Sequence, residues 1–307
     1  MSPRPLVHIG MPKCASTWLQ NAYFQKRHGF EMASEVAPAH TALIAPISFR
    51  FSDWSEGRQF FNFETGDRVP VISAEVLVGN PLTGGDNGET MLHRLRQLVP
   101  EARILLIIRE QQAMIRSIYK TLVTFGSPLS IEDHLYNDLP GNMPSFSAQY
   151  LFYDDIIAAY QAVFGADSVL VLTLEQFQAE PQEFLTALNG FCGVDSERYP
   201  LKANPKNRVN PNFSLVSLEL KRLYNRFVAK TRMSPAGLIK PRLIGERGVV
   251  HPPVPAFVEN WMERRFAAKI AYLTDGFYAQ SNARTEGLTG LQLRELGYQL
   301  PDAGPAQ

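Results

Sequence analysis

The chain is organised around the stretch VHIGMPKCASTWLQ, residues 7–20. A short apolar run ends in a turn that contains Gly10 and Pro12, a lysine lies inside the turn, and two hydroxyl residues open a helical pattern. This order of strand, loop and helix start is typical of an anion site, because loop N–H groups and the positive end of the helix dipole both favour negative charge. The sequence therefore predicts a phosphate-binding loop.

The composition restricts what kind of protein this is. Lysine plus arginine and aspartate plus glutamate both total 30, and this balance gives no support for a nucleic-acid or membrane-surface binder. The two cysteines, Cys14 and Cys192, have no metal-ligand spacing, so no metal is expected. The N-terminal residues are too few and too polar for a signal peptide, and the longest apolar run, residues 104–108, is too short to cross a bilayer. We expect a soluble, cytoplasmic protein.

Apolar runs alternate along the chain with amphipathic helical patterns. Such alternation predicts a parallel sheet with right-handed crossovers. The expected fold is α/β, a P-loop-like three-layer α/β/α arrangement around a central parallel sheet of about four to five strands. Residues 1–280 are expected to form one domain and residues 281–307 a peripheral tail. The strands are predicted at residues 5–9, 69–73, 102–108 and 169–173, and the main helices at 16–27, 89–99, 147–164, 180–191, 214–230 and 255–272.

The loop can be compared first with the Walker A pattern, Gly-x-x-x-x-Gly-Lys-[Ser/Thr]. Gly10 fits its first position, but Ala15 and Ser16 stand where Gly-Lys is required, and the lysine is displaced to Lys13. A nucleoside triphosphatase with this loop would lack its usual phosphate clamp. A P-loop nucleotide kinase is therefore kept as an alternative, and the displaced lysine argues against it.

The segment from Pro12 to Leu19, PKCASTWL, resembles the 5′-phosphosulfate loop of the sulfotransferase family, Pro-Lys-[Ser/Cys/Gly]-Gly-[Thr/Ser]-[Thr/Ser]-x-Leu. Members of that family bind 3′-phosphoadenosine 5′-phosphosulfate (PAPS) there and transfer its sulfuryl group. Ala15 departs from the pattern, and an alanine fits only if its φ is negative. The resemblance implies a catalytic role for Lys13, which would stabilise the leaving phosphate, and PAPS contacts from Lys13, Cys14, Ala15, Ser16, Thr17 and Trp18. Core packing is an equally good interpretation of Trp18.

A second motif resembles the family's 3′-phosphate site. Sulfotransferases place an arginine at the end of a central apolar strand and a serine eight residues later, and Arg109 and Ser117 match these positions. A guanidinium fork and a hydroxyl are suited to a phosphate dianion. Taken alone, a strand-end arginine and a surface serine would be the better interpretation. Together with the upstream loop, the pair predicts a second phosphate site.

The wider resemblance, to bacterial sulfotransferases of the glycan-modifying kind, covers roughly residues 5–230. It implies a hydroxyl of a carbohydrate or similar polar acceptor as substrate. Many members place a general base just after the second strand, which makes Glu75 the first choice, with Glu35 and His251 as alternatives. The loop around His251 vaguely resembles the basic loop that closes over the donor, which gives Arg247 a phosphate role.

One alternative lies outside catalysis. A degenerate family member would bind a nucleotide or a partner without turnover, and the position of the general base discriminates between the two cases. The basic helix at residues 221–232 would suit an acidic glycan or a homodimer contact, although such helices are usually solvated faces. The acceptor pocket is expected from variable loops, here residues 29–68, 126–147 and the region after residue 201.

Overall fold

A computed structural model describes residues 3–32, 43, 66–81, 85, 87–136, 146–195, 197–200, 214–229 and 253–302. Within these ranges the protein is built on one five-stranded sheet whose paired strands are all parallel, in the order β2-β3-β1-β4-β5. The α/β fold class and the parallel sheet are confirmed. The strands are β1 Leu6–His8, β2 Phe30–Met32, β3 Val69–Ser73, β4 Arg103–Ile108 and β5 Val169–Thr173.

The longest apolar run of the sequence forms an interior strand of the sheet. β4 lies between β1 and β5, and its residues 104–108 are all buried, as expected for a continuous apolar run covered on both faces. β2 is a strand that the sequence analysis did not predict, and it pairs with β3 at one edge of the sheet. It has only three residues, too few for a recognisable alternation.

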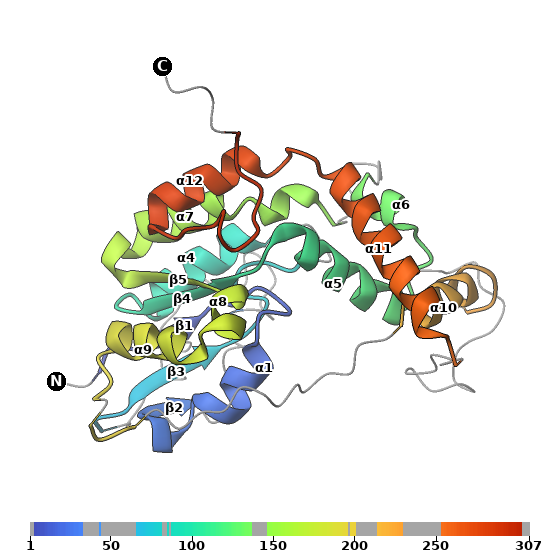
Figure 1. Cartoon of the computed structure of the whole chain (residues 1–307). Coiled ribbons are helices and arrows are strands. Elements are labelled where there is room, and N and C mark those ends of the chain that lie inside the picture. Colours follow the sequence, from blue (N-terminus) through green and yellow to red (C-terminus); the bar gives the residue numbers. More distant parts are fainter. Residues whose placement is uncertain are drawn as a thin grey trace.

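Helices cover both faces of the sheet (Figure 1). One face carries α1, α8 and α9: the Trp18 and Phe177 rings lie 5.0 Å apart, and the Tyr23 hydroxyl donates to Asn189 Oδ1 at 2.8 Å. The other carries α4, α7 and α12, where the Arg284 side chain pairs with Asp154. The bounds are α1 Ser16–Trp18, α4 Gly88–Leu98, α5 Gln111–Thr124, α6 Ile131–Leu135, α7 Tyr153–Phe164, α8 Leu174–Ala179, α9 Pro181–Cys192, α10 Leu215–Phe227, α11 Ala256–Leu273 and α12 Ala279–Thr289.

A group of helices, α5, α10 and α11, extends beyond the sheet on the right of Figure 1. The buried Asn225 of α10 donates from Nδ2 to the carbonyls of Val123 and Ser127 at 2.7 and 3.0 Å, which anchors α10 to the end of α5. Glu263 of α11 pairs with Arg116 and Lys120 of α5. These contacts hold the helix that begins just after β4 in a fixed orientation.

The helix predicted over residues 16–27 is much shorter than expected. Regular α-helix ends at Trp18, and Leu19–Tyr23 form a wider turn in which the Phe24 N–H donates to the Leu19 carbonyl at 2.7 Å. Such wide turns are uncommon and often lie at functional sites. Here the wider turn brings Tyr23 and Phe24 into the core, where both are fully buried.

The C-terminal segment differs from the expected peripheral tail over residues 281–307. Asn282 is fully buried and exchanges hydrogen bonds with Gln111 at 2.5 and 3.2 Å. The Tyr298 hydroxyl donates to Glu175 Oε2 at 3.0 Å. Residues 279–298 therefore pack against the domain, on the segments that follow β4 and β5. The sequence did not indicate this because α12 has little amphipathic character.

Candidate active site

The predicted site lies at the carboxyl ends of the parallel strands. The loop of residues 9–15 follows β1, Glu75 follows β3, Arg109 follows β4, and Glu175 follows β5. In open α/β sheets, ligands bind outside these strand ends, where the strand order reverses direction. The chain passes from β1 to the β3 side and then returns across β1 to β4, so the reversal lies beside β1. The sheet topology thus brings together motifs that lie far apart in the sequence.

The loop after β1 has an unusual backbone. Gly10, Lys13 and Ala15 have φ values of 30°, 65° and 61°, in the region that side chains other than glycine rarely adopt. The condition stated for an alanine at this position, a negative φ, is therefore not met, because Ala15 occupies a left-handed position. Left-handed residues alternating with ordinary ones turn successive N–H groups toward a common concavity, which is a recurrent anion-binding arrangement.

The polar side chains of the loop are available to a ligand. Lys13 is exposed, Thr17 is half-buried, and neither has a side-chain partner among the described residues. Ser16 is only 2% exposed, and its Oγ makes no hydrogen bond within that same part of the chain. A buried hydroxyl without a partner is costly, about 1–3 kcal/mol, so its presence needs an explanation.

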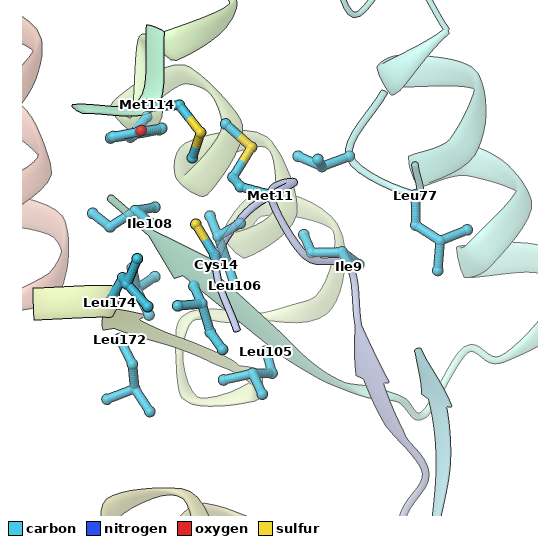
Figure 2. Close-up of a cluster of buried hydrophobic side chains, with 14 of the residues drawn as sticks. Ile9, Met11, Cys14, Leu77, Leu105, Leu106, Ile108, Met114, Leu172 and Leu174 are labelled. Carbon is cyan, nitrogen blue, oxygen red and sulfur yellow. The ribbon is translucent and has the colours of Figure 1, made fainter. Parts of the chain in front are cut away.

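Two of the predicted loop contacts differ from the others because their side chains point into the core. Cys14 lies among Leu106, Ile108 and other apolar side chains (Figure 2), and burial raises the pKa of its thiol. Only its backbone can face a ligand. Trp18 is 9% exposed and packs on Tyr23 and Phe177, so core packing accounts for its position. Contact with adenine stays a prediction for Trp18.

Arg109 and Ser117 lie at the end of β4 and on α5. The Arg109 carbonyl accepts a hydrogen bond from the Tyr153 hydroxyl at 2.6 Å, and Glu110 caps α5 by accepting from the N–H groups of Gln112 and Ala113. The junction between strand and helix is therefore rigid. Within the described ranges, neither the Arg109 guanidinium nor the Ser117 hydroxyl has a partner. A matching anion would find both groups free.

The neighbouring cations of α5 are already paired. Arg116 and Lys120 both contact Glu263, Lys120 at 3.2 Å. Burial, and secondarily the charge of Arg116, lowers the pKa of Lys120 to about 8. Burial and the charge of Arg109 lower the pKa of Arg116. Arg109 is therefore close to Arg116 but keeps its own guanidinium free, which distinguishes it from the structural cations around it.

Glu75 and Arg109 are close enough to the loop for their charges to affect the Cys14 thiol. Behind the dominant effect of burial, the charge of Arg109 lowers the pKa of the Cys14 thiol, and the charges of Glu175 and Glu75 raise it. Glu75 is half-buried and opens a turn in which the Leu77 N–H donates to the Ala74 carbonyl at 3.3 Å. A carboxylate is thus present on the β3 side of the loop, opposite Arg109. Glu35, Arg247 and His251 lie outside the described residues.

A cavity of about 340 Å³ lies next to the turn that Glu75 opens. Its walls are mainly apolar and aromatic, and Tyr160 and Tyr150 tie it to that turn by donating to the carbonyls of Leu77 and Gly79 at 3.1 and 2.9 Å. The cavity size suits a small molecule. The lining residues are Val78, Gly85, Gly88, Glu89, Leu92, Ser147, Gln149, Tyr150, Phe152, Asp155, Ile156, Ala159 and Tyr160.

Three residues near the site were not singled out by the sequence analysis. His8 is buried in β1 and contacts Ser73, Glu175 accepts from the Glu110 N–H at 3.2 Å, and Tyr298 holds Glu175. The position of Glu175 directly after a strand was a usable signal. No local pattern pointed to Tyr298, because its contact partner is 123 residues away.

No group of three or more His, Cys, Asp or Glu side chains in the described ranges could hold a metal ion. No helix in the described part of the chain is long and apolar enough to cross a membrane.

No protein-family model matches this chain, and no curated protein is similar to it in sequence. Solved structures do resemble it. A crystal structure of a sulfotransferase from Alicyclobacillus acidocaldarius is 19% identical, with a TM-score of 0.48 over 71% of this chain and 90% of that one. Mouse sulfotransferase SULT7A1 complexed with PAP is 13% identical, with a TM-score of 0.39 over 92% and 88%. The sulfotransferase domain of the Synechococcus PCC 7002 olefin synthase is 13% identical, with a TM-score of 0.36 over 73% and 94%. All three are sulfotransferases, the family that the two sequence motifs resemble.

Proposed function

We propose that this chain is a sulfotransferase that moves a sulfuryl group from PAPS to a hydroxyl of a carbohydrate or similar polar acceptor. One observation carries the proposal. The segments after the adjacent strands β1 and β4 each hold polar side chains without described partners: Lys13, Ser16 and Thr17 after β1, and Arg109 and Ser117 after β4. Neighbouring strands are about 4.8 Å apart. Two anion sites this close suit an adenosine that carries phosphates on the 3′ and 5′ positions of its ribose.

The residues of the loop would hold the 5′-phosphosulfate. Converging N–H groups, the Lys13 ammonium and the two hydroxyls supply the donors that such an anion requires. Arg109 and Ser117 would hold the 3′-phosphate by a guanidinium fork and a hydroxyl. The orphaned Ser16 hydroxyl supports this fit, because a phosphate oxygen would supply the partner that it lacks.

The chemistry needs one base and one cation. The acceptor oxygen attacks sulfur as the bond from sulfur to the bridging oxygen breaks, and the acceptor proton passes to the base. Glu75 is the candidate base because it is half-buried and its charge reaches the loop. Lys13 would stabilise the charge that develops on the leaving phosphate. The cavity that Val78 lines, three residues after Glu75, is the space that we propose for part of the acceptor.

Nucleotide binding tests the donor site directly. We expect 3′-phosphoadenosine 5′-phosphate (PAP) to raise the melting temperature without magnesium, and to bind more tightly than adenosine 5′-phosphate, which lacks the 3′-phosphate. Arg109→Ala should remove most of that preference. Lys13→Ala should lower the affinities for PAP and for adenosine 5′-phosphate by the same factor. Isothermal titration calorimetry measures these affinities.

The control is Arg226→Ala, since Arg226 is an exposed arginine on α10 and should leave both affinities unchanged. Absence of PAP binding by the wild-type protein at millimolar concentration contradicts the proposal. Magnesium-dependent binding of ATP in preference to PAP would favour the kinase alternative instead.

The role of Glu75 is tested by turnover. After an acceptor is found by screening candidates with ³⁵S-labelled PAPS, Glu75→Gln should lower kcat by about 10²–10⁴-fold, because the glutamine amide does not take up the acceptor proton. PAP affinity should stay the same. Glu101→Gln, at an exposed glutamate before β4, is the matched control. Unchanged kcat in Glu75→Gln would remove Glu75 as the base.

A further inference from the structure

His8 is a polar residue in the centre of an apolar sheet. It is the last residue of β1, is 1% exposed, and pairs in register with Ser73 of β3. Its Nδ1 lies 2.8 Å from Ser73 Oγ. Gln20, from the turn after α1, donates from Nε2 to Ser73 Oγ at 3.0 Å and to the Ser73 carbonyl at 3.3 Å. A buried polar group in such a position needs an explanation beyond packing.

The hydrogen bonds around Ser73 allow an arrangement in which Nε2 of His8 carries the ring proton. Ser73 Oγ accepts from Gln20 and can donate its own hydrogen to His8 Nδ1. With the hydrogen bond in that direction, the ring proton of neutral His8 is on Nε2, and this is the tautomer that the inference below uses. Burial keeps the ring neutral at physiological pH, since it lowers the pKa of His8 to about 4.

Two buried polar atoms of this region, both without a hydrogen-bond partner in the described part of the chain, lie next to the same space beside Gly10. His8 Nε2 and Ser16 Oγ have no hydrogen-bond partner among the described residues. Both lie within 3.4 Å of one point, the position that a Cβ on Gly10 would occupy, at 3.1 and 3.4 Å respectively. The absence of a side chain at Gly10 therefore leaves a space that the histidine N–H and the serine oxygen share.

We propose that His8 is a positioning residue for the donor loop: when the loop binds an anion, the Nε2–H of His8 donates to the Ser16 oxygen, so that the Ser16 proton points to that anion. The chain Gln20–Ser73–His8–Ser16 then links β3, β1 and the loop through hydrogen bonds. In this structure the two atoms are not hydrogen-bonded to each other, so the contact would form with the anion in place, where it removes the cost of two unpaired buried groups. The inference rests on the proposed function, because the anion is taken to be the 5′-phosphate group of the donor.

The alternative is that His8 only fills the core. Its ring lies 6.0 Å from the Phe24 ring in an edge-on arrangement, which is an ordinary packing contact. A packing role predicts that substitutions lower stability without any dependence on Ser16. A positioning role predicts that the effect on ligand affinity disappears once the Ser16 hydroxyl is removed. A double-mutant cycle separates the two.

The experiment measures PAP affinity by calorimetry for wild type, His8→Asn, His8→Gln, Ser16→Ala and the double variant His8→Asn/Ser16→Ala. Asparagine can replace Nδ1 but does not reach the loop, whereas glutamine can place an amide N–H near the position of Nε2. We expect His8→Asn and Ser16→Ala each to weaken PAP binding by about tenfold, the scale of one hydrogen bond to a charged ligand. The double variant should be no weaker than either single variant, and His8→Gln should recover part of the loss.

Two results would overturn the inference while leaving the proposed function intact. The first is an unchanged PAP affinity in His8→Asn, and the second is a double variant whose loss of PAP affinity equals the product of the two single losses. Absence of PAP binding by wild type would instead overturn both. If a His8 variant does not fold, ¹⁵N NMR of the wild-type ring decides: a protonated Nε2 whose signal shifts in Ser16→Ala supports the inference, and a protonated Nδ1 contradicts it.

Discussion

Ala15 and Lys13 show that backbone strain is concentrated in the candidate site. Both have positive φ values, 61° and 65°, and no other described residue apart from glycines does. Each such residue costs about 1–2 kcal/mol relative to an ordinary conformation. The surrounding structure imposes this cost because the loop must turn sharply from the buried β1 into α1. The strain accompanies the convergence of N–H groups that suits an anion.

Replacing Ala15 by glycine should therefore stabilise the protein. We expect Ala15→Gly to raise the free energy of unfolding by about 0.5–1 kcal/mol, because glycine adopts φ 61° without a Cβ clash, and this outweighs its larger entropy in the unfolded chain. Urea unfolding followed by circular dichroism measures the change. The same substitution at Ala158, an exposed residue inside α7, is the control and should lower stability by a similar amount. Destabilisation by Ala15→Gly would show that the strain has been misassigned.

Among the elements, α12 offers a matched pair of glycines that separates helix propensity from backbone conformation. Gly287 lies inside the helix, and Gly290 ends it with φ 72° while its N–H donates to the Glu286 carbonyl. A Cβ at either position would meet nothing within 4 Å. The two positions therefore differ in backbone conformation but not in available space.

Substitution of these glycines by alanine should have opposite effects. We expect Gly287→Ala to stabilise the protein by about 0.5–1 kcal/mol through helix propensity, and Gly290→Ala to destabilise it by about 1 kcal/mol through left-handed strain. Thermal and urea unfolding measure both. Equal effects of the same sign would mean that α12 is not positioned as described.

Element boundaries were predictable where the signals were local. Strands β3 and β5 begin and end at the predicted residues, because each is an apolar run bounded by turn residues. The capping box of Ser130 and Asp133, which begins α6, is a local signal of the same kind. The early end of α1 was not predictable, since the same apolar spacing fits a regular helix and a wider turn. Packing of Tyr23 and Phe24 in the core decides between them.

At the scale of the whole molecule, the C-terminal residues 279–299 support the candidate site through hydrogen bonds to the segments that follow β4 and β5. Asn282 pairs with Gln111 just after Arg109 and Glu110, and also donates to the Gln299 carbonyl at 2.8 Å. Tyr298 holds Glu175, which in turn accepts from the Glu110 N–H. Two of these contacts, from Asn282 to Gln111 and from Tyr298 to Glu175, join residues more than 120 positions apart, and together the contacts fix the strand end that carries Arg109.

Buried histidines should make the stability of the whole molecule fall in acid. Burial lowers the pKa of both His8 and His134 to about 4, against 6.5 in the unfolded chain. Between these values the unfolded state binds protons that the folded state does not, so stability decreases as the pH falls from about 6.5 to 4. Each histidine contributes up to about 1.4 kcal/mol per pH unit over that interval.

Urea unfolding at pH 7 and pH 5 checks this expectation. His134→Asn should lose less stability between the two pH values than wild type does, although its stability at pH 7 is lower. His93→Asn is the control, because its imidazole is largely exposed. Carboxylates titrate equally in all three proteins, so an identical pH dependence of His134→Asn and wild type would contradict a buried neutral His134.

The sequence by itself determined the class of fold and the two motifs of the candidate site. Apolar runs, caps and turn residues act over a few neighbours, so the parallel α/β architecture, the loop around Lys13 and the strand-end Arg109 could be recognised locally. The short β2, the left-handed φ of Ala15 and the packing of residues 279–298 could not. Only the tertiary structure brought Glu75, Arg109 and Glu175 close enough for their charges to affect the pKa of the Cys14 thiol. Only the tertiary structure placed His8 and Ser16 next to one space beside Gly10. These relations depend on the order of strands in the sheet, and that order is set by packing between segments distant in sequence, which no local pattern encodes.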